Sequence, residues 1–267
     1  MKHARIVRMY DYINQRERVT LEELQHQFNV SLNTIRRDVA QLIAEGKVNK
    51  IYGGVCVKNL QMNKISFNDR ALTNLDAKDY ICSIAAKMIH NGDTVFIDSG
   101  TTVQSLLKYL QKKQNITIVT HNVYLVTDAI KYDNINVFSL CGILNRKSGC
   151  VIGEGVNRHL ETININKAFI CASSISENGD VSSEVMCERE IKQQAIRRSF
   201  VKYLLVDSSK FIESRFCVFA NINQFDFIIT DTIPCQKYND YFNYAGVECI
   251  YSITDLEEDK WNYSWTY

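Results

Sequence analysis

The 267-residue sequence has no apolar run approaching the roughly 20 residues that a membrane-spanning helix needs. Its first residues lead into an amphipathic segment and lack the apolar core of a signal peptide. Although there are nine cysteines, no two have the C-x-x-C spacing of zinc and redox sites. No pair of titratable residues has a spacing diagnostic of catalysis. We therefore expect a soluble cytoplasmic protein with reduced thiols, no cofactor, no metal and no membrane partner.

What the sequence does contain is the composition of a globular protein, 46% hydrophobic and 23% charged, with an uneven distribution of charge. Residues 1–58 hold 10 Lys and Arg against 6 Asp and Glu, whereas the rest holds 21 against 24. The net charges are thus +4 and −3. This asymmetry predicts that only the first part of the chain meets a polyanion.

The first 57 residues show apolar positions at helical spacing in three successive stretches, 6–13, 21–28 and 35–42. Before the second stretch, Thr20 is suited to cap a helix, and Glu23 is placed to return a hydrogen bond to the cap. A tight break at residues 29–30 follows. The pattern predicts a small helical domain over residues 1–57.

The third helix is predicted to begin at Ser31 and to bury one apolar stripe, leaving polar residues on the other faces of its first turns. Arginine offers two parallel donors to guanine O6 and N7, and small polar side chains bond bases or phosphates. We expect this helix to read double-stranded DNA through Ser31, Asn33, Thr34, Arg36 and Arg37.

A stop at Glu45-Gly46 precedes a predicted hairpin over residues 47–55, in which Lys50 and Tyr52 are expected to touch the DNA backbone as a wing. The alternative is a three-helix domain used for protein contacts, with solvated arginines. The order of helix, turn, helix and wing favours DNA binding.

Residues 58–75 are polar and aperiodic, which predicts a linker that packs against the following domain, residues 76–267. In that domain β-rich runs alternate with amphipathic stretches. The predicted strands are 94–98, 116–120, 135–140, 167–171, 203–207 and 225–230, and the predicted helices are 77–90, 102–110, 122–130 and 188–200. Such alternation predicts an α/β domain with a mainly parallel sheet and helices on its faces.

Small, polar or charged residues follow five of these strands, at the edge where open parallel sheets bind ligands. The most specific is the turn at residues 98–102, where a glycine lets the backbone approach an anion and hydroxyls donate to it. We expect effector contacts from Asp98, Ser99, Gly100, Thr101, Thr102, Thr120, Asn122, Gly142, Asp207 and Lys210.

Each of these positions also has an ordinary interpretation. The turn at residues 98–102 is then a capped strand-to-helix turn, Lys210 is solvated, and His121 is a hydrogen-bonded loop residue. Glu188 and Lys192, four residues apart on a predicted helix, are then a surface pair.

The run Val30-Ser31-Leu32-Asn33-Thr34-Ile35-Arg36-Arg37-Asp38-Val39, followed by Gly46 and Tyr52-Gly53-Gly54, resembles the signature of the DeoR family of bacterial sugar-catabolism regulators. Motifs similar to that family's sensor domain follow in the same order: Gly92-Asp93-Thr94, Asp98-x-Gly100-Thr101-Thr102, Thr120-x-Asn122, Ser148 with Gly153, Lys167-Ala168-Phe169, Glu188-x-Glu190-x-Lys192 and Asp207-x-Ser209-Lys210-Phe211. The resemblance implies a sensor fold related to ribose-5-phosphate isomerase and a phosphorylated sugar or related metabolite as effector.

The sequence departs from the family pattern near the expected effector site. Cys141 stands where the family usually has the first of two glycines, and His121 separates Thr120 from Asn122. In the wing, Lys50 and Tyr52 replace the usual Arg-x-His pattern. The departures at residues 121 and 141 indicate either an effector that differs from the common ones or a reduced affinity for the effector.

Three functions remain open from the sequence. The first is a repressor of a carbohydrate-catabolism operon, acting as a homo-oligomer (dimer or tetramer) because paired heads must match two half-sites. The second is a sugar-phosphate isomerase or transferase with an accessory N-terminal domain. The third, motivated by Cys141 and His121, is a regulator that has lost its ligand.

Overall fold

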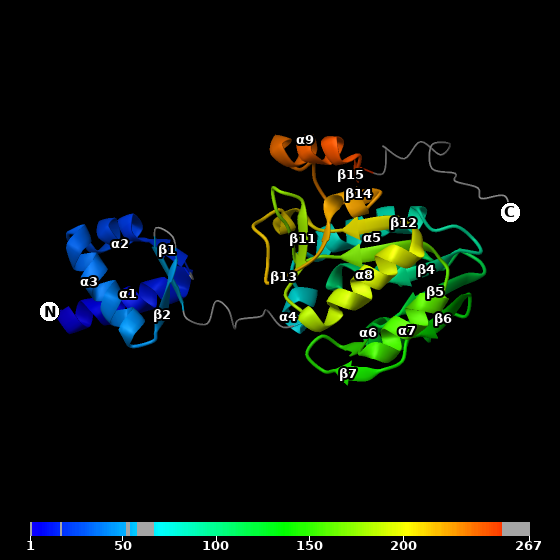
Figure 1. Ribbon diagram of the computed structural model, residues 1–267, viewed down its shortest axis with the longest axis horizontal. Coiled ribbons are helices and arrows are strands. Elements are labelled where there is room, and N and C mark those ends of the chain that lie inside the picture. Colours follow the sequence, from blue (N-terminus) through cyan, green and yellow to red (C-terminus); the bar gives the residue numbers. More distant parts are fainter. Residues whose placement is uncertain (1, 17, 52–53, 58–66, 253–267) are drawn as a thin grey trace. The chain divides into compact units, whose positions relative to one another are not determined.

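The computed structural model describes residues 2–16, 18–51, 54–57 and 67–252, and it divides the chain into two compact units, Met1–Ile65 and Ser66–Tyr267 (Figure 1). Each unit has an apolar core of its own. Within the described ranges no helix has the length and apolar character needed to cross a membrane. The aromatic C-terminal tail lies outside the described residues.

The first unit contains the helices α1 (Lys2–Arg16), α2 (Leu21–Phe28) and α3 (Leu32–Ala44), together with a small antiparallel sheet. The sheet has the order β1-β3-β2, with β1 (Arg18–Thr20), β2 (Val48–Ile51) and β3 (Gly54–Val57). The antiparallel pairing of β2 with β3 confirms the predicted hairpin, here called the wing. Strand β1, which directly precedes α2, was not predicted. It pairs with β3 and so joins the wing to the start of α2.

Local hydrogen bonds fix the predicted ends of these helices. Thr20 Oγ1 accepts a bond from Glu23 N at 3.0 Å, and Glu23 Oε2 accepts one from Thr20 N at 2.7 Å, which confirms the capping box. Asn29 ends α2 in the left-handed conformation, with φ of 48°. Ser31 caps α3 by accepting a bond from Thr34 N at 3.3 Å.

The second unit is built on a seven-stranded sheet in the order β15-β14-β12-β9-β4-β5-β6, in which every pairing is parallel. The strands are β4 (Thr94–Ile97), β5 (Ile116–Thr120), β6 (Ile135–Ser139), β9 (Ile165–Cys171), β12 (Ser199–Leu205), β14 (Phe227–Ile229) and β15 (Glu248–Ile250). Six of them confirm predicted strands, and β15 was not predicted.

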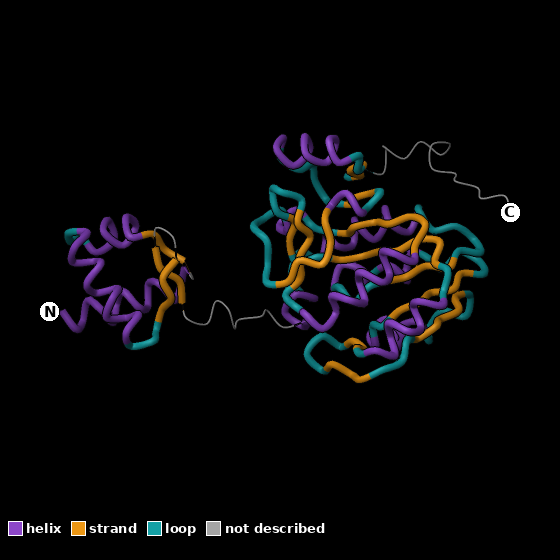
Figure 2. The backbone as a smooth tube through the Cα atoms, in the orientation of Figure 1, coloured by secondary structure: helices purple, strands orange, loops and turns teal. Residues whose placement is uncertain are grey.

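Helices cover both faces of this sheet, so the α/β fold with a mainly parallel sheet is confirmed (Figure 2). The helices of the unit are α4 (Phe67–Ala71), α5 (Leu75–Lys87), α6 (Val123–Ala129), α7 (Glu154–Thr162), α8 (Arg189–Arg198) and α9 (Gln236–Ala245). Successive strand residues face opposite sides: Ile97 lies in the core that includes α5, and Phe96 in the core that includes α8.

The prediction of a helix over residues 102–110 is wrong. The chain there forms two 3₁₀ segments, η2 (Thr101–Val103) and η3 (Leu106–Tyr109). Val103, Leu106 and Leu110 are all fully buried. Their three- and four-residue spacing fits successive 3₁₀ turns as well as an α-helix, so periodicity could not separate the two.

Smaller elements surround the carboxyl edge of the sheet. A hairpin joins β7 (Ile143–Asn145) to β8 (Cys150–Ile152), and a second antiparallel sheet has the order β10-β11-β13. Its strands are β10 (Ser174–Ile175), β11 (Asp180–Ser183) and β13 (Cys217–Asn221), and the short 3₁₀ segments are η4 (Met186–Glu188), η5 (Ser208–Lys210) and η6 (Ile222–Gln224).

All nine cysteines lie in the described part of the chain, and all are free thiols. No cluster of three or more metal-ligating side chains occurs among the described residues.

Candidate nucleic-acid interface and effector site

Helix α3 separates an apolar face from a polar one. Ile35 and Leu42 are fully buried, whereas Arg36 and Arg37 are exposed and make no ion pair with any residue that the structure describes. Two free guanidinium groups on one short helix can therefore reach an external partner.

The orientation of α3 is fixed by a contact that the sequence did not reveal. Asp38 is buried, and its carboxylate accepts a hydrogen bond from Arg5 Nε of α1 at 2.7 Å. This hydrogen bond raises the pKa of Arg5, so the guanidinium stays charged. The pair holds α3 against α1, while Arg36 and Arg37, which directly precede Asp38 in the sequence, stay exposed.

The other predicted DNA contacts surround the same helix and the wing. Ser31 and Asn33 are exposed, and Thr34 is half-buried, with its hydroxyl 2.9 Å from that of Ser31. Lys50 is exposed on β2. Tyr52 lies outside the described residues.

In the second unit the strand order reverses between β4 and β9. After β4 the chain runs through β5 and β6 on one side, and β9, β12, β14 and β15 then lie on the other. Such a switch point is where open α/β sheets bind their ligands, beyond the carboxyl ends of the strands.

Asp98, directly after β4, lies at this switch point and is completely buried. Its Oδ2 accepts a hydrogen bond from Cys171 N at the end of β9 at 2.8 Å, and it pairs closely with Lys192 Nζ of α8. Lys192 also donates to Cys171 O at 3.1 Å. Burial by itself would raise the pKa of Asp98, but the charge of Lys192 holds it below its usual value. The ion pair therefore fixes β4, β9 and α8 to one another.

Glu188 and Lys192 are not the surface pair that their spacing allowed, because both are 3% exposed. Glu188 Oε2 accepts a hydrogen bond from Ser99 Oγ at 2.7 Å. Residue 188 stands at the junction of η4 and α8, so the carboxylate turns inward to the strand ends. The i, i+4 spacing carried no signal of this burial.

The turn after β4 comes very close to β9. A Cβ on Gly100 would lie 2.4 Å from Cys171 Cβ, so only glycine fits there. Thr101 and Thr102 are buried in η2, and Thr102 O accepts a bond from Cys82 Sγ at 2.8 Å. The turn at residues 98–102 is thus packed closely over the end of β9, and anion binding by it stays a prediction.

The residues after β5 join the same group. Thr120 Oγ1 donates to Ile97 O at 2.6 Å, and Asn122 Oδ1 caps α6 by accepting from Tyr124 N at 3.0 Å. The amide of Asn122 lies 3.5 Å from Asp98 O. The structure thus brings residues 98–99, 120 and 122 together.

Asp207 and Lys210, which follow β12, belong to a second polar group at the same edge. Asp207 Oδ1 accepts from Asn74 Nδ2 at 3.1 Å, and Lys210 Nζ lies 3.8 Å from Asp207 Oδ2. Lys78 of α5, which the sequence did not single out, is buried and donates to Arg70 O. Burial lowers the pKa of Lys78, while the charge of Asp207 counteracts this effect.

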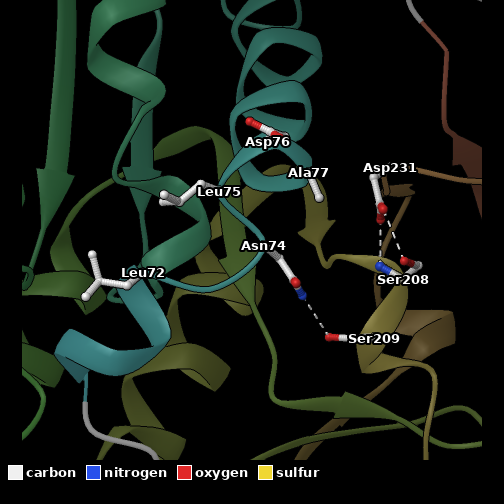
Figure 3. Close-up of a pocket in the computed structure, with 8 residues that line it drawn as sticks. All are labelled: Leu72, Asn74, Leu75, Asp76, Ala77, Ser208, Ser209 and Asp231. Carbon is white, nitrogen blue, oxygen red and sulfur yellow. Dashed lines mark hydrogen bonds between the residues drawn. The ribbon is translucent and has the colours of Figure 1, made fainter.

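A cavity of about 690 Å³ opens beside the second group, between the start of α5 and the loops after β12 and β14 (Figure 3). Asn74 points toward Ser209, and Ser208 donates to Asp231 from its backbone at 2.6 Å. Gly142, also a predicted effector contact, does not line this cavity. It packs against β8 instead, where a Cβ on residue 142 would lie 2.4 Å from Ile152 O. The side chains that line the cavity are thus the hydroxyl and amide groups of Ser208, Ser209 and Asn74, the carboxyl groups of Asp76 and Asp231, and the apolar Leu72, Leu75 and Ala77.

The chain matches two family models along most of its length. Residues 5–61 match the DeoR-like helix-turn-helix domain, and residues 73–232 match the DeoR C-terminal sensor domain. The chain belongs to the DeoR family. The match spans both units, so this DeoR-family chain carries the DNA-binding and sensor modules together.

Curated relatives support the same conclusion over more than nine tenths of the chain. The transcriptional regulator IolR of Bacillus subtilis is 34% identical over 91% of this chain and 96% of its own length. The transcriptional repressor GlcR of Bacillus subtilis is 29% identical, over 97% and 99%. The lactose phosphotransferase system repressor of Staphylococcus epidermidis is 28% identical, over 92% and 98%.

Solved structures similar to this family member include a D-ribose-5-phosphate isomerase in complex with phospho-erythronic acid, with 17% identity and a TM-score of 0.40 over 52% of this chain and 54% of that one. The matched families and curated relatives, in contrast, are transcriptional regulators. The isomerase or transferase alternative is therefore not supported, and this DeoR-family protein is a DNA-binding transcriptional regulator.

Proposed function

We propose that the protein represses a carbohydrate-catabolism operon and releases its operator when a phosphorylated sugar binds the second unit. The observation that carries the proposal is the pairing, in one DeoR-family chain, of an exposed Arg36-Arg37 pair on a capped helix with a polar switch point. In this assignment residues 1–57 bind DNA, residues 58–75 are the linker and residues 76–267 sense the effector. Because its partner is chromosomal DNA, the protein would act in the bacterial cytoplasm.

The proposed DNA contacts are Ser31, Asn33, Thr34, Arg36, Arg37, Lys50 and Tyr52. The arginines are placed to read guanine, and the others to bond phosphates or bases. A homo-oligomer, dimer or tetramer, would present paired heads to two half-sites. The relatives named as repressors support the direction of control.

The proposed effector contacts are Asp98, Ser99, Gly100, Thr101, Thr102, Thr120, Asn122, Gly142, Asp207 and Lys210. Lys78 is added to this set because it lies within electrostatic range of Asp207, Lys210 and Cys171. Together, Lys78 and Lys210 provide the positive charge that a phosphate needs. Helix α5, which carries Lys78, packs against η2 of the hydroxyl-rich turn.

The DNA-binding half of the proposal is tested by gel shift on fragments of the upstream region of the gene at two salt concentrations. We expect selective binding that weakens steeply with salt, and loss of selectivity in Arg36→Ala and Arg37→Ala. Arg8→Ala is the matched control, because Arg8 is an exposed arginine on α1 rather than α3. It should weaken binding to all fragments alike. Binding that selects no fragment, in the wild type and the variants, would contradict the proposal.

A further inference from the structure

The switch point gathers polar atoms that have no partner. In the described part of the chain, seven buried side-chain nitrogen and oxygen atoms lack a hydrogen-bond partner. Four of the seven belong to three residues: Nδ1 and Nε2 of His121, Oγ of Ser148 and Oε1 of Glu188. A buried polar atom without a partner is costly, so such a concentration in one region indicates groups held ready for a ligand.

His121 occupies the centre of this region. Its ring stacks on Phe96, with centroids 5.8 Å apart, and its Nε2 lies 4.0 Å from Asp98 Oδ1, too far for a hydrogen bond. Its backbone is fixed, because His121 O accepts from Val151 N of β8 at 2.8 Å. The ring is therefore held in place by packing while both nitrogens stay unpaired.

Burial lowers the pKa of His121, so the ring is neutral at neutral pH. A neutral imidazole offers one N–H donor and one acceptor nitrogen. The unpaired Glu188 oxygen is an acceptor, and the Ser148 hydroxyl can donate or accept. Donors mixed with acceptors in this way complement the hydroxyl groups of a sugar or polyol.

The charges of the same region disfavour a phosphate. Asp98 already pairs with Lys192, and Oε1 of the second acidic side chain, Glu188, has no hydrogen-bond partner among the described residues. An anion placed against a buried carboxylate is repelled strongly in a medium of low dielectric constant. The positive charge of Lys78 and Lys210 lies instead in the group around Asp207.

We propose that His121, with Glu188 and Ser148, binds the hydroxyl groups of the effector and selects a polyhydroxylated sugar or polyol phosphate over a simple phosphate. This assignment rests on the proposed function, because it deepens the effector site described above. The effector would lie with its hydroxyls at the ends of β4 and β5 and with its phosphate toward Lys78 and Lys210. His121, which departs from the family pattern, is then a specificity-determining residue.

The test compares His121→Phe with the wild type by thermal unfolding, alone and with glucose 6-phosphate, fructose 6-phosphate, ribose 5-phosphate, glycerol 3-phosphate or methyl phosphate. Phenylalanine keeps the stacking on Phe96 and removes both nitrogens. We expect the ligand-free variant to melt about 3 °C higher than the wild type, because unpaired buried atoms are lost. The stabilisation by sugar phosphates should fall to that given by methyl phosphate.

Two further variants make the result decisive. His90→Phe is the matched control, because His90 Nδ1 is partnered by Lys167 Nζ at 2.8 Å, and it should leave the response to sugar phosphates unchanged. Glu188→Gln keeps the size of the side chain and should also weaken the response, which provides a second readout if the phenylalanine variant fails to fold.

The outcomes separate this inference from the function on which it rests. A wild type that responds to sugar phosphates, with an equal response in His121→Phe or Glu188→Gln, would overturn the inference and leave the proposed function standing. A wild type that no sugar phosphate stabilises would overturn the proposed effector class itself, and this inference with it.

Discussion

The Asp98–Lys192 pair is a point where a single substitution is expected to have a large energetic effect. Both side chains are nearly inaccessible, and each satisfies the other while also bonding the backbone of Cys171. A buried charge without its partner is strongly destabilising, whereas a pair that is removed together costs much less.

We therefore expect Lys192→Met to lower the free energy of unfolding by about 3–5 kcal/mol, because it leaves Asp98 charged and unpaired. The double variant Asp98→Asn with Lys192→Met should recover part of this loss. Urea unfolding of the wild type, both single variants and the double variant measures the coupling. Strict additivity of the two single losses would contradict the assigned ion pair.

His121 gives a prediction for pH. Its folded pKa lies below the unfolded value of about 6.5, so below that pH the unfolded chain binds a proton that the folded protein does not. The free energy of unfolding should fall as the pH drops from about 6.5 toward the folded pKa, by up to about 1.4 kcal/mol per pH unit.

Unfolding measured at several pH values between neutral and mildly acidic should show a shallower dependence in His121→Phe than in the wild type. Burial also lowers the pKa of His90, so His90 contributes to the pH dependence that remains in His121→Phe. A slope identical in both proteins would show that His121 is not buried in its neutral form.

At the scale of elements, α4 and the start of α5 connect the strand-end loops with the chain segment that leads from the DNA-binding unit. Phe67 stacks on Tyr124 of α6 at 4.7 Å, and α4 packs against η2. Asn74 reaches Asp207. These contacts connect residues 67–74 to the loops where the effector is proposed to bind.

From these contacts we expect Phe67→Ala to reduce the effect of a sugar phosphate on operator affinity while the sugar phosphate itself still binds. Coupling between two sites typically changes an affinity about 5–150-fold. In this variant the ratio of operator affinities without and with the sugar phosphate should fall toward 1. Thr73→Ala is the control, because Thr73 is exposed on the same segment and does not line the cavity. Operator titrations with and without ligand measure the ratio, and an unchanged ratio in Phe67→Ala would exclude this route.

Elements with strong periodicity or local caps were predictable from the sequence. The apolar runs of β4, β5 and β9 and the cap at Thr20 depend on neighbouring residues only. By contrast, α7 buries just Val156 and Leu160, and β15 has three residues, so neither gave a clear pattern.

In the candidate site, too, only the features that depend on neighbouring residues were predictable from the sequence. The sequence indicated the turn at residues 98–102 and Asp207 because each follows a strong strand. It did not indicate that Glu188, Lys78 and His121 are buried, because their surroundings come from elements distant in the chain. The partner of Asp38, Arg5, was missed for the same reason: 33 positions separate the two residues.

At the scale of the whole molecule, the basic first unit is proposed to bind DNA and the mildly acidic second unit to bind the effector. A ligand that binds one arrangement of the oligomer more tightly increases the population of that arrangement. The resulting change in operator affinity is limited by the difference between the ligand's affinities for the two arrangements. Because coupling between two binding sites is reciprocal, operator DNA should in turn weaken the binding of the sugar phosphate.

The most direct test is a fluorescence anisotropy titration of labelled upstream DNA with the full-length protein, with and without saturating sugar phosphates from the panel above. We expect at least one of them to weaken operator binding about tenfold or more, equivalent to about 1.4 kcal/mol, whereas methyl phosphate should not. Operator binding that no sugar phosphate changes, in a protein that still selects its own upstream DNA, would contradict the claim that this repressor is gated by a phosphorylated sugar.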